Sequence, residues 1–386
     1  MCYASRFGAT CKFCAVRLHV MQNIASLSGS VRIPYALRRV PNSKFATLLP
    51  CPAQFKSGDI ALARLENIGK NTRLELAAGR AATLHVGDTL AVVFGNRYAT
   101  EQFEGYAQAD GDACDLLSMG GVCGMVKSKH DDVSQPSRLR LLGAIGDTEG
   151  CQLRLRDFSL NGFSAIELTK LPRIAAVCGS SMDAGKTHTA MSLISGLRQG
   201  DQRVAGIKLT GTAAGRDTWN LLDAGALQAF DFVDGGLPST YLCSLDELLL
   251  LADLLLSHAA AANVDWIVVE IADGLLQKET AALLQSPSFT SKVNAWLFAT
   301  CDPLGAVGGV ALLRSWGIEP IAISGLISQS PLGMLEIEGA TGIRCTTARN
   351  LQRGKLNKLL IKPNDVHPRQ DSNAPLFARP ESTANV

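Results

Sequence analysis

The sequence predicts two folded parts, a small all-β domain followed by an α/β domain with a mostly parallel sheet. The length of 386 residues exceeds what one ordinary hydrophobic core holds, so two domains are the default expectation. Between residues 56 and 170, short runs of alternating polarity are separated by Gly, Asn and Asp, which is typical of β structure. Between residues 171 and 361, continuous apolar runs alternate with helical patterns, which indicates a parallel sheet covered on both faces.

The first 55 residues show little periodicity, and we expect a basic, poorly structured N-terminal arm. No acidic residue precedes Asp59, whereas basic residues recur before it: Arg6, Lys12, Arg17, Arg32, Arg38, Arg39, Lys44 and Lys56. A flexible arm, a true translation start at Met21 and an organellar transit peptide are the alternative explanations.

The cysteine pattern is that of reduced thiols rather than of a disulfide framework. The 11 cysteines are odd in number and mostly lie inside apolar runs, as Cys178 does. Cys11 and Cys14 form a lone CxxC pair, with Cys2 and His19 nearby. Such a pair is a weak zinc signal, because a closed zinc site needs four ligands at workable spacing. We therefore expect a cytoplasmic location and leave a metal at this pair open.

Short strands are predicted throughout the β domain, residues 56–170. Alternating polarity, as in Leu74-Glu-Leu and Leu153-Arg-Leu-Arg, fits strands that are buried on one side. The predicted strands cover residues 59–66, 72–76, 88–94, 114–119, 137–143 and 151–157. Regular short strands with turn signals favour a small barrel or a sandwich. Such a domain can serve as a structural cap or docking surface, and the aromatic platform that oligonucleotide binding needs is thin.

The α/β domain begins after the Lys-Leu-Pro sequence at residues 170–172 and is expected to end near residue 361. The predicted strands cover residues 173–178, 203–209, 265–270, 294–300 and 320–327. Helices are predicted from residue 185 onward and over residues 246–262 and 304–316. The tail, residues 362–386, is rich in Pro, Asn, Asp, Gln and Ser, and we expect it to be disordered.

Composition and charge exclude several classes of protein. Hydrophobic residues make up 47% and charged residues 19% of the chain, so neither a disordered nor a fibrous protein is expected. The formal net charge of +2 does not require a nucleic-acid partner. The most apolar stretch, residues 248–262, contains Asp253 and His258 and is too short to span a bilayer. We therefore expect neither a membrane nor a nucleic-acid partner.

One segment carries a recognisable phosphate-binding motif. The sequence Gly-Ser-Ser-Met-Asp-Ala-Gly-Lys-Thr at residues 179–187 matches G-x-x-x-x-G-K-[ST], the P-loop or Walker A motif, between an apolar strand and a helix. Backbone amides of such a loop surround phosphate oxygens, Lys186 would reach the β- and γ-phosphates as a solvated side chain, and Thr187 would ligate Mg²⁺. The predicted nucleotide-binding residues are Gly179, Ser180, Ser181, Met182, Asp183, Ala184, Gly185, Lys186, Thr187 and His188.

A P-loop normally works with a second carboxylate at the end of a neighbouring strand. Glu270, which closes the run Trp-Ile-Val-Val-Glu, fits this role, and Asp302 is a weaker candidate for it. GTPase identity is unsupported, because the Asn357-Lys358 pair lacks the Asp that reads guanine. Ser180 stands where the partition ATPases carry a lysine. The domain is therefore predicted to be an α/β P-loop NTPase domain with ATP as its nucleotide.

The C-terminal half resembles dethiobiotin synthetase. The loop at 179–187 resembles that family's Gly-Thr-Asp-Thr-Asp/Glu-Val-Gly-Lys-Thr, and Gly206-Ile-Lys-Leu-Thr-Gly is similar to its Gly-x-Lys-Pro-Val-x-x-Gly. Residues 268–274 resemble its Val-Glu-Gly-Ala-Gly-Gly, and residues 296–327 resemble its later strand, helix and strand. The resemblance covers residues 173 to 330. Ser181 and Leu209 depart from the pattern, as does the Gly-Leu-Ile segment from residue 325.

The resemblance implies roles for particular side chains. Lys186 would hold phosphates, and Lys208 would lie between the γ-phosphate and an acidic acceptor, which makes these two lysines the catalytic candidates. Thr187, Asp217 and Glu270 would surround Mg²⁺.

These patterns lead to one function and two alternatives. The leading hypothesis is a Mg-ATP-dependent enzyme, ligase-like or kinase-like, that activates a carboxylate-like small-molecule acceptor by phosphoryl transfer. A nucleotide-driven switch that acts through the β domain is the first alternative. A cofactor-maturation accessory protein, in the style of the molybdopterin-guanine-dinucleotide factors, is the second. A homodimer is compatible with all three hypotheses.

Overall fold

The computed structural model describes residues 22–23, 31–162 and 171–361. The predictions about Cys11, Cys14, Met21 and the tail from residue 362 lie outside these residues. Within the described part of the chain, none of the helices is both long enough and apolar enough to cross a bilayer.

The chain divides into two compact units that do not follow the sequence order. The first unit contains the residues up to Asn161 together with Thr210–Arg216 and Phe232–Ser244. The second unit contains Gly162–Leu209, Asp217–Asp231 and the residues from Leu245 onward. The C-terminal half of the sequence therefore contributes two segments to the first unit. A single boundary along the sequence does not separate the two units.

The first unit is built around a nine-stranded sheet and a separate two-stranded sheet. The large sheet contains β1 (Gln22–Asn23), β2 (Val31–Arg32), β3 (Thr47–Leu49), β4 (Ile60–Asn67), β7 (Thr89–Phe94), β8 (Phe103–Tyr106), β9 (Ala113–Leu116), β10 (Val122–Lys129) and β11 (Ser137–Gly146). The small sheet pairs β5 (Arg73–Glu75) with β6 (Ala81–Thr83). The short helices are η2 (Tyr35–Leu37), η3 (Asn42–Lys44) and η4 (Leu155–Phe158). The expectation of a β-rich N-terminal half is confirmed.

Strand pairing in the large sheet returns on itself. Pairings run from β11 to β4, β7, β10 and β9, and β9 pairs again with β11, so these strands form a closed ring of pairings. Alternate residues of β4 and β7 enter one buried cluster, because successive side chains of a strand point to opposite faces. Its members from these two strands are Ala61, Ala63, Leu65, Leu90, Val92 and Phe94.

Two predictions for this unit differ from the structure. Residues 31–55 are not a poorly structured arm, because Tyr35, Ala36 and Leu37 form the buried helix η2, which packs against β7. A single turn of this kind leaves no periodic pattern in a sequence, so the prediction missed it. Residues 151–157 do not form a strand. Only isolated bridges occur at Gln152 and Arg154, and the 3-10 helix η4 follows.

The second unit is an α/β domain with a six-stranded parallel sheet, as predicted. Its strands are β12 (Arg173–Gly179), β13 (Val204–Lys208), β14 (Gln228–Asp231), β15 (Trp266–Glu270), β16 (Ala295–Ala299) and β17 (Ala322–Ser324). Its helices are α1 (Lys186–Gln199), α2 (Gly215–Asp223), α3 (Leu245–Ala261), α4 (Lys278–Leu284), α5 (Pro287–Thr290), α6 (Pro303–Ser315), η6 (Leu326–Gln329), α7 (Pro331–Thr341), α8 (Ala348–Gln352) and α9 (Asn357–Leu360), of which α2 starts within the first unit.

The order of strands places β12 in the interior of the sheet. The sheet runs β14-β13-β15-β12-β16-β17, and all its pairings are parallel. Lys208 at the end of β13 pairs in register with Glu270 on β15 and with Asp231 on β14. The carboxyl ends of these strands therefore bring a lysine and two carboxylates to one edge of the sheet, where open α/β sheets bind ligands.

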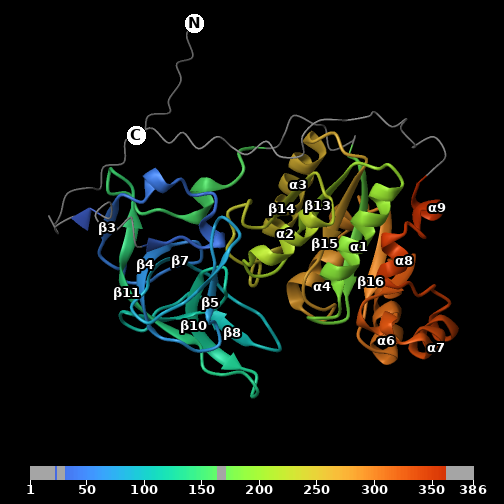
Figure 1. The fold of residues 1–386 in the computed structure, drawn as a ribbon, viewed down its shortest axis with the longest axis horizontal. Helices are drawn as coiled ribbons and strands as arrows, with labels where there is room; N and C mark the ends of the chain where they lie inside the picture. Colours follow the sequence, from blue (N-terminus) through green and yellow to red (C-terminus); the bar gives the residue numbers. More distant parts are fainter. Residues whose placement is uncertain (1–21, 24–30, 163–170, 362–386) are drawn as a thin grey trace, which may run out of the picture. The chain divides into compact units, whose positions relative to one another are not determined.

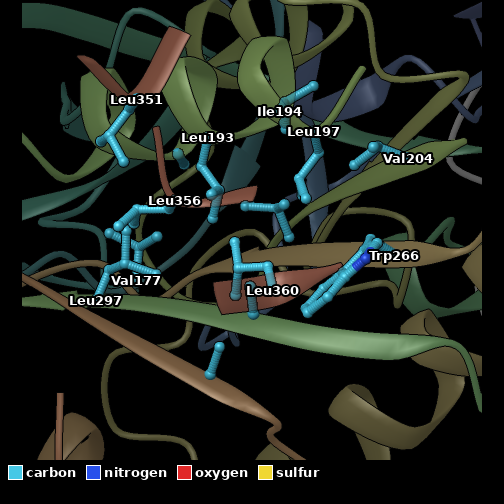
Figure 2. Close-up of a cluster of buried hydrophobic side chains, with 14 of the residues drawn as sticks. Val177, Leu193, Ile194, Leu197, Val204, Trp266, Leu297, Leu351, Leu356 and Leu360 are labelled. Atoms are coloured by element: carbon cyan, nitrogen blue, oxygen red, sulfur yellow. The ribbon is translucent and has the colours of Figure 1, made fainter. Parts of the chain in front are cut away.

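Helices cover both faces of this sheet. Figure 2 shows one face, where Leu193, Ile194 and Leu197 of α1 pack with Val177 of β12 and with residues of α8 and α9. Side chains alternate along a strand, so the residues adjacent to these on each strand point to the other face of the sheet. Phe298 of β16 lies there, so close to Gly309 of α6 that any side chain at Gly309 would collide with its ring. In Figure 1, α1 and α8 lie side by side along the strands. Burial on both faces explains why the strands read as continuous apolar runs.

Candidate nucleotide and magnesium site

The motif at residues 179–187 connects β12 to α1, as predicted. Asp183 and Gly185 have φ angles of 55° and 92°, both in the left-handed region. A Cβ atom at Gly185 would lie 3.0 Å from the Cα atom of Gly325, so this position needs glycine for two reasons. The loop turns sharply and ends at the N-terminus of the 14-residue helix α1. A strand, a tight loop and a helix N-terminus in this order form the P-loop arrangement, which suits an anionic phosphate group.

Lys186 is buried, with 6% of its surface exposed, and this corrects the expectation of a solvated side chain. Its ammonium donates a hydrogen bond of 2.5 Å to the carbonyl oxygen of Ser181 within the same loop. Burial lowers the pKa of Lys186, and the nearby carboxylates of Glu270 and Asp273 partly oppose this shift. In P-loops a lysine at this position binds a phosphate oxygen, and here its hydrogen-bond acceptor is the loop carbonyl.

Glu270 lies at the end of β15 and is almost completely buried, with 2% of its surface exposed. Its Oε1 atom accepts a hydrogen bond of 2.7 Å from the hydroxyl of Thr187. Its Oε2 atom has no hydrogen-bond partner among the described residues. A buried carboxylate oxygen without a partner is costly, so this atom marks a place where a cation or a donor is needed.

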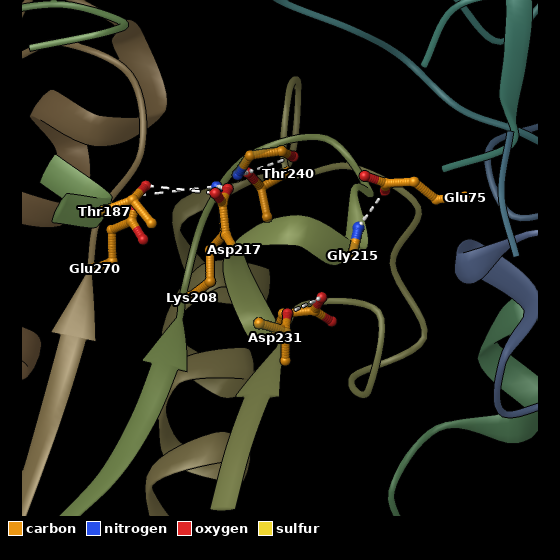
Figure 3. A network of polar contacts seen from close by, with 10 residues as sticks. Glu75, Thr187, Lys208, Gly215, Asp217, Asp231, Thr240 and Glu270 are labelled. Carbon is orange, nitrogen blue, oxygen red and sulfur yellow. Dashed lines mark hydrogen bonds and ion pairs between the residues drawn. The ribbon is translucent and has the colours of Figure 1, made fainter. Parts of the chain in front are cut away.

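Asp217 reaches the same place from α2. It forms an ion pair with Lys208, and one of its carboxylate oxygens lies 3.5 Å from the hydroxyl of Thr187. The ammonium of Lys208 also lies 3.9 Å from Oε1 of Glu270. Figure 3 shows these four side chains together. The structure therefore brings together Thr187, Lys208, Asp217 and Glu270, the residues that the resemblance implied for the metal and for catalysis.

These residues fit a magnesium ion in the presence of a nucleotide. Mg²⁺ is usually held by one or two carboxylates together with phosphate oxygens and water, rather than by an all-protein cage. Thr187, Asp217 and Glu270 supply a hydroxyl and two carboxylates, and the unpartnered Oε2 atom of Glu270 is free to accept a cation. Residues 31–162 and 171–361 contain no cluster of three or more His, Cys, Asp or Glu side chains that could hold a metal alone.

Asp302, the weaker candidate for the metal site, has a structural role. It is the N-cap of α6, and its Oδ1 atom accepts a hydrogen bond of 2.8 Å from the amide of Gly305. An Asp that caps the first turn of a helix satisfies an amide that would otherwise lack a partner. The residue type and its place after a strand are therefore explained without a metal.

A cavity of about 380 Å³ opens beside the P-loop. His188 on α1 lines it, as do Gln329 on η6 and Arg349 on α8. None of the described residues around this cavity is Asp or Glu. Its position next to Gly185 and its size suit the base of a nucleotide whose phosphates occupy the loop.

Sequence reasoning missed several residues near the loop. Gly274 lies so close to the P-loop that a Cβ atom there would be 2.4 Å from the carbonyl oxygen of Ser180. Its neighbour Asp273, with a φ of 64°, interacts electrostatically with Lys186. Both residues belong to the segment 268–274 that resembles dethiobiotin synthetase, which was an available signal. Gln329 and Arg349 had no signal, because they lie on η6 and α8, helices too short to leave a periodic pattern in the sequence.

Comparisons with solved structures find partial matches of low identity. The 54 kDa signal recognition particle protein from Aeropyrum pernix K1, in complex with GDP, is 19% identical with a TM-score of 0.36, over 51% of this chain and 49% of that chain. The signal recognition particle receptor FtsY from Elizabethkingia anophelis, in complex with GDP, is 13% identical with a TM-score of 0.34, over 50% and 61%. A ParA family ATPase from Chlorobium tepidum TLS is 14% identical with a TM-score of 0.29, over 50% and 95%.

This chain spans about half the length of the first of these structures. No protein-family model matches the sequence. No curated protein matches it either. The function of this chain is therefore inferred from the site residues themselves.

Proposed function

We propose that this protein is a Mg-ATP-dependent enzyme that transfers the γ-phosphoryl group of ATP to a carboxylate-like acceptor. The observation that carries the proposal is the buried Glu270, with one oxygen bound to the Thr187 hydroxyl and the other without a partner. The P-loop, the buried Lys186 and the neighbouring Asp217 complete a site for a metal-bound triphosphate. Magnesium would neutralise charge on the β- and γ-phosphates when bound there.

Lys208 supports phosphoryl transfer to an anionic acceptor rather than nucleotide binding alone. Its side chain is 11% exposed and its ammonium lies beside both Asp217 and Glu270. The P-loop already supplies Lys186 for the phosphates, so the second lysine at the end of β13, which pairs with Asp217, is the candidate to hold a further negative group. A positive charge fixed between two anions lowers the cost of bringing them together for reaction.

The proposed function is tested by measuring thermal stabilisation and turnover in the same preparation. Mg-ATP should raise the melting temperature, and ADP release should increase when the correct acceptor is added from a panel of small carboxylates. Ligand binding at a hundred times Kd stabilises a protein by about 2.7 kcal/mol, which a melting curve detects easily. Absence of any stabilisation by ATP or GTP with Mg²⁺ would remove the nucleotide site from this protein.

Glu270→Gln should weaken the dependence on magnesium while leaving nucleotide binding in place. The substitution removes a negative charge but keeps the shape and the acceptor for Thr187. We expect the Mg²⁺ concentration for half-maximal ADP formation to rise by about tenfold or more. Asp217→Asn should shift it in the same direction.

Glu319→Gln is the matched control for this experiment. Glu319 is an exposed carboxylate that pairs with Arg314 in the same unit, so its loss should leave the Mg²⁺ titration unchanged. If Glu270→Gln and Asp217→Asn both titrate like the wild type, these carboxylates do not hold the metal.

The cavity beside the P-loop should prefer adenine to guanine. Guanine presents two adjacent donors, which a carboxylate pairs best, and the described cavity lining contains no carboxylate. An unpaired polar group costs about 1 kcal/mol or more, so ATP should bind at least about fivefold more tightly than GTP. Isothermal titration with ATP and GTP measures this ratio directly.

Gln329→Glu provides the companion test of base recognition. It adds a carboxylate to the cavity with almost no change in shape, so the preference for adenine should decrease. Equal affinities for the two nucleotides in the wild type, or an unchanged ratio in the variant, would show that the base binds elsewhere.

A nucleotide-driven switch is the second candidate, and one observation favours it. The segments Thr210–Arg216 and Phe232–Ser244 leave the α/β domain at the carboxyl ends of β13 and β14 and belong to the β-rich unit. Chain segments at this edge of a sheet are well placed to respond to a bound nucleotide. A switch should hydrolyse ATP slowly without any acceptor effect and should change proteolytic sensitivity in the β-rich unit between ADP and ATP states.

A further inference from the structure

The segment Thr210–Arg216 is held firmly inside the β-rich unit. The carboxylate of Glu75, at the end of β5, accepts a hydrogen bond of 2.6 Å from the amide of Gly215. Glu75 is itself buried, with 7% of its surface exposed, and its own amide is bound to the carbonyl of Met119. A hydrogen bond of an ionised carboxylate to a backbone amide is stronger than a neutral one, so this contact fixes the position of Gly215.

A second contact holds the same segment two residues earlier. The hydroxyl of Ser118 donates a hydrogen bond of 2.9 Å to the carbonyl of Ala213. A Cβ atom at Gly120 would lie 2.2 Å from that carbonyl oxygen, so the two backbones approach as closely as glycine permits. Because Met119 also binds the amide of Glu75, the two contacts come from one connected surface of the β-rich unit.

The other inserted segment, Phe232–Ser244, forms further hydrogen bonds to the first. Ala213 donates a hydrogen bond of 3.0 Å to the carbonyl of Pro238, and Thr240 donates one of 2.9 Å to the carbonyl of Gly211. The hydroxyl of Thr240 also accepts a hydrogen bond of 2.8 Å from the amide of Gly211. Thr210–Arg216 is therefore bound along its length, which leaves little freedom at the point where α2 begins.

Helix α2 begins in this segment and also contains a residue of the candidate metal site. Gly215 is the first residue of the helix, and Asp217 is the third. Figure 3 shows Glu75 on Gly215 at one end of this short connection, and Asp217 with Lys208 and Thr187 at the other. Because a helix turn is stiff, a shift of Gly215 moves Asp217 with it.

We propose that Glu75 is a positioning residue for the magnesium site, acting through Gly215 and the first turn of α2 on Asp217. This inference rests on the proposed magnesium-nucleotide function. Glu75 would thereby affect metal binding only through the backbone between Gly215 and Asp217. Misplacement of a metal-binding carboxylate by a fraction of an ångström weakens binding, as loss of an outer contact does in other metal sites.

Glu75→Ala tests the proposal through the metal rather than through activity alone. The Mg²⁺ concentration needed for half-maximal ATP-dependent stabilisation should rise by about tenfold. ATP binding without Mg²⁺ should stay close to the wild-type value, because the P-loop and Lys186 are unaffected. Glu75→Gln keeps an oxygen that accepts the Gly215 amide and should restore most of the Mg²⁺ affinity. Glu66→Ala, an exposed carboxylate on β4 paired with Arg140, is the matched control and should behave like the wild type.

A double-mutant cycle separates positioning from general destabilisation. If Glu75 acts through Asp217, then Glu75→Ala should cause no further rise in the Mg²⁺ requirement of Asp217→Asn protein. Additive effects in the cycle, or a wild-type Mg²⁺ titration in Glu75→Ala, would overturn the proposal. If Glu75→Ala does not fold, Ser118→Ala removes the neighbouring contact and should shift the titration in the same direction, and no shift would overturn the proposal too.

The two hypotheses fail in distinguishable ways. If Mg-ATP does not stabilise the wild-type protein, this result would contradict the proposed function. Wild-type protein that responds to Mg-ATP, with Glu75 variants that respond equally well, would contradict only the role of Glu75.

Discussion

Replacing Lys208 with alanine should cut single-turnover ADP formation by about a hundredfold or more while leaving ATP affinity nearly unchanged. Losing one preorganised charge partner in an active site typically costs this much. Lys208 ends β13, in register with Glu270, and its ammonium is paired with Asp217. It is therefore fixed at the edge of the sheet but is not part of the P-loop, so it should affect reaction more than binding.

The measurement compares ATP affinity with single-turnover ADP formation, with and without a candidate acceptor. Lys292→Ala is the matched control, because Lys292 forms an ion pair with Asp253 in the same unit and is expected to have no role in the reaction. A nucleotide switch predicts a different result, in which Lys208→Ala mainly weakens nucleotide or partner binding. Equal rates in wild type and variant, with affinity intact, would remove Lys208 from the mechanism and with it the main support for carboxylate activation.

The α/β domain was predictable because its strands are buried on both faces. Runs such as residues 265–270 and 294–300 have no polar interruption, and the structure places β15 and β16 within a residue of these bounds. Strand β14 escaped prediction because its sequence, Gln-Ala-Phe-Asp at the sheet edge, is short and partly exposed. Edge strands bury less surface, so the hydrophobic pattern that identifies a strand is weak there.

The exchange of segments between the two units could not be predicted from the sequence. Thr210–Arg216 and Phe232–Ser244 are glycine-containing stretches without a periodic pattern, which predict loops but not where those loops pack. Their position depends on single contacts, such as the Glu75 carboxylate on the Gly215 amide. These contacts join residues far apart in the sequence, and no periodic pattern of the sequence indicates them.

The candidate site was predicted more completely than the fold around it. Motif spacing identified the P-loop, and Glu270 followed from its place at the end of a buried strand. The strands of a parallel sheet end at one edge, so the topology alone predicts that Glu270 lies close to the P-loop. The cavity residues Gln329 and Arg349, by contrast, are recruited by η6 and α8 from irregular sequence, so only the folded structure brings them to the P-loop.

Replacing Lys186 should abolish the thermal stabilisation by Mg-ATP without unfolding the protein. The ammonium of Lys186 donates a hydrogen bond to the loop carbonyl of Ser181, and an anionic phosphate oxygen would be a stronger acceptor for it. Lys186→Met is preferred to Lys186→Ala, because Lys186 is buried and Met keeps most of its apolar stem. The expected loss is the whole ligand shift, about 2.7 kcal/mol at a hundred times Kd. Retention of the shift in both variants would contradict the role of Lys186.

The lowered pKa of Lys186 predicts opposite pH dependences for ATP affinity and for the stability of the protein without nucleotide. Burial lowers the pKa of Lys186, so the ammonium loses its proton at a lower pH than an exposed lysine does. ATP affinity should therefore fall as the pH rises through this lowered pKa, since phosphate needs the charged form. The free energy of unfolding of the protein without nucleotide should increase as the pH rises from the lowered pKa to the ordinary pKa of lysine. In this interval the unfolded chain still binds the proton, whereas the folded protein has lost it. Lys186→Met should lack this contribution to both trends, and identical pH profiles for wild type and variant would show that Lys186 does not titrate in this way.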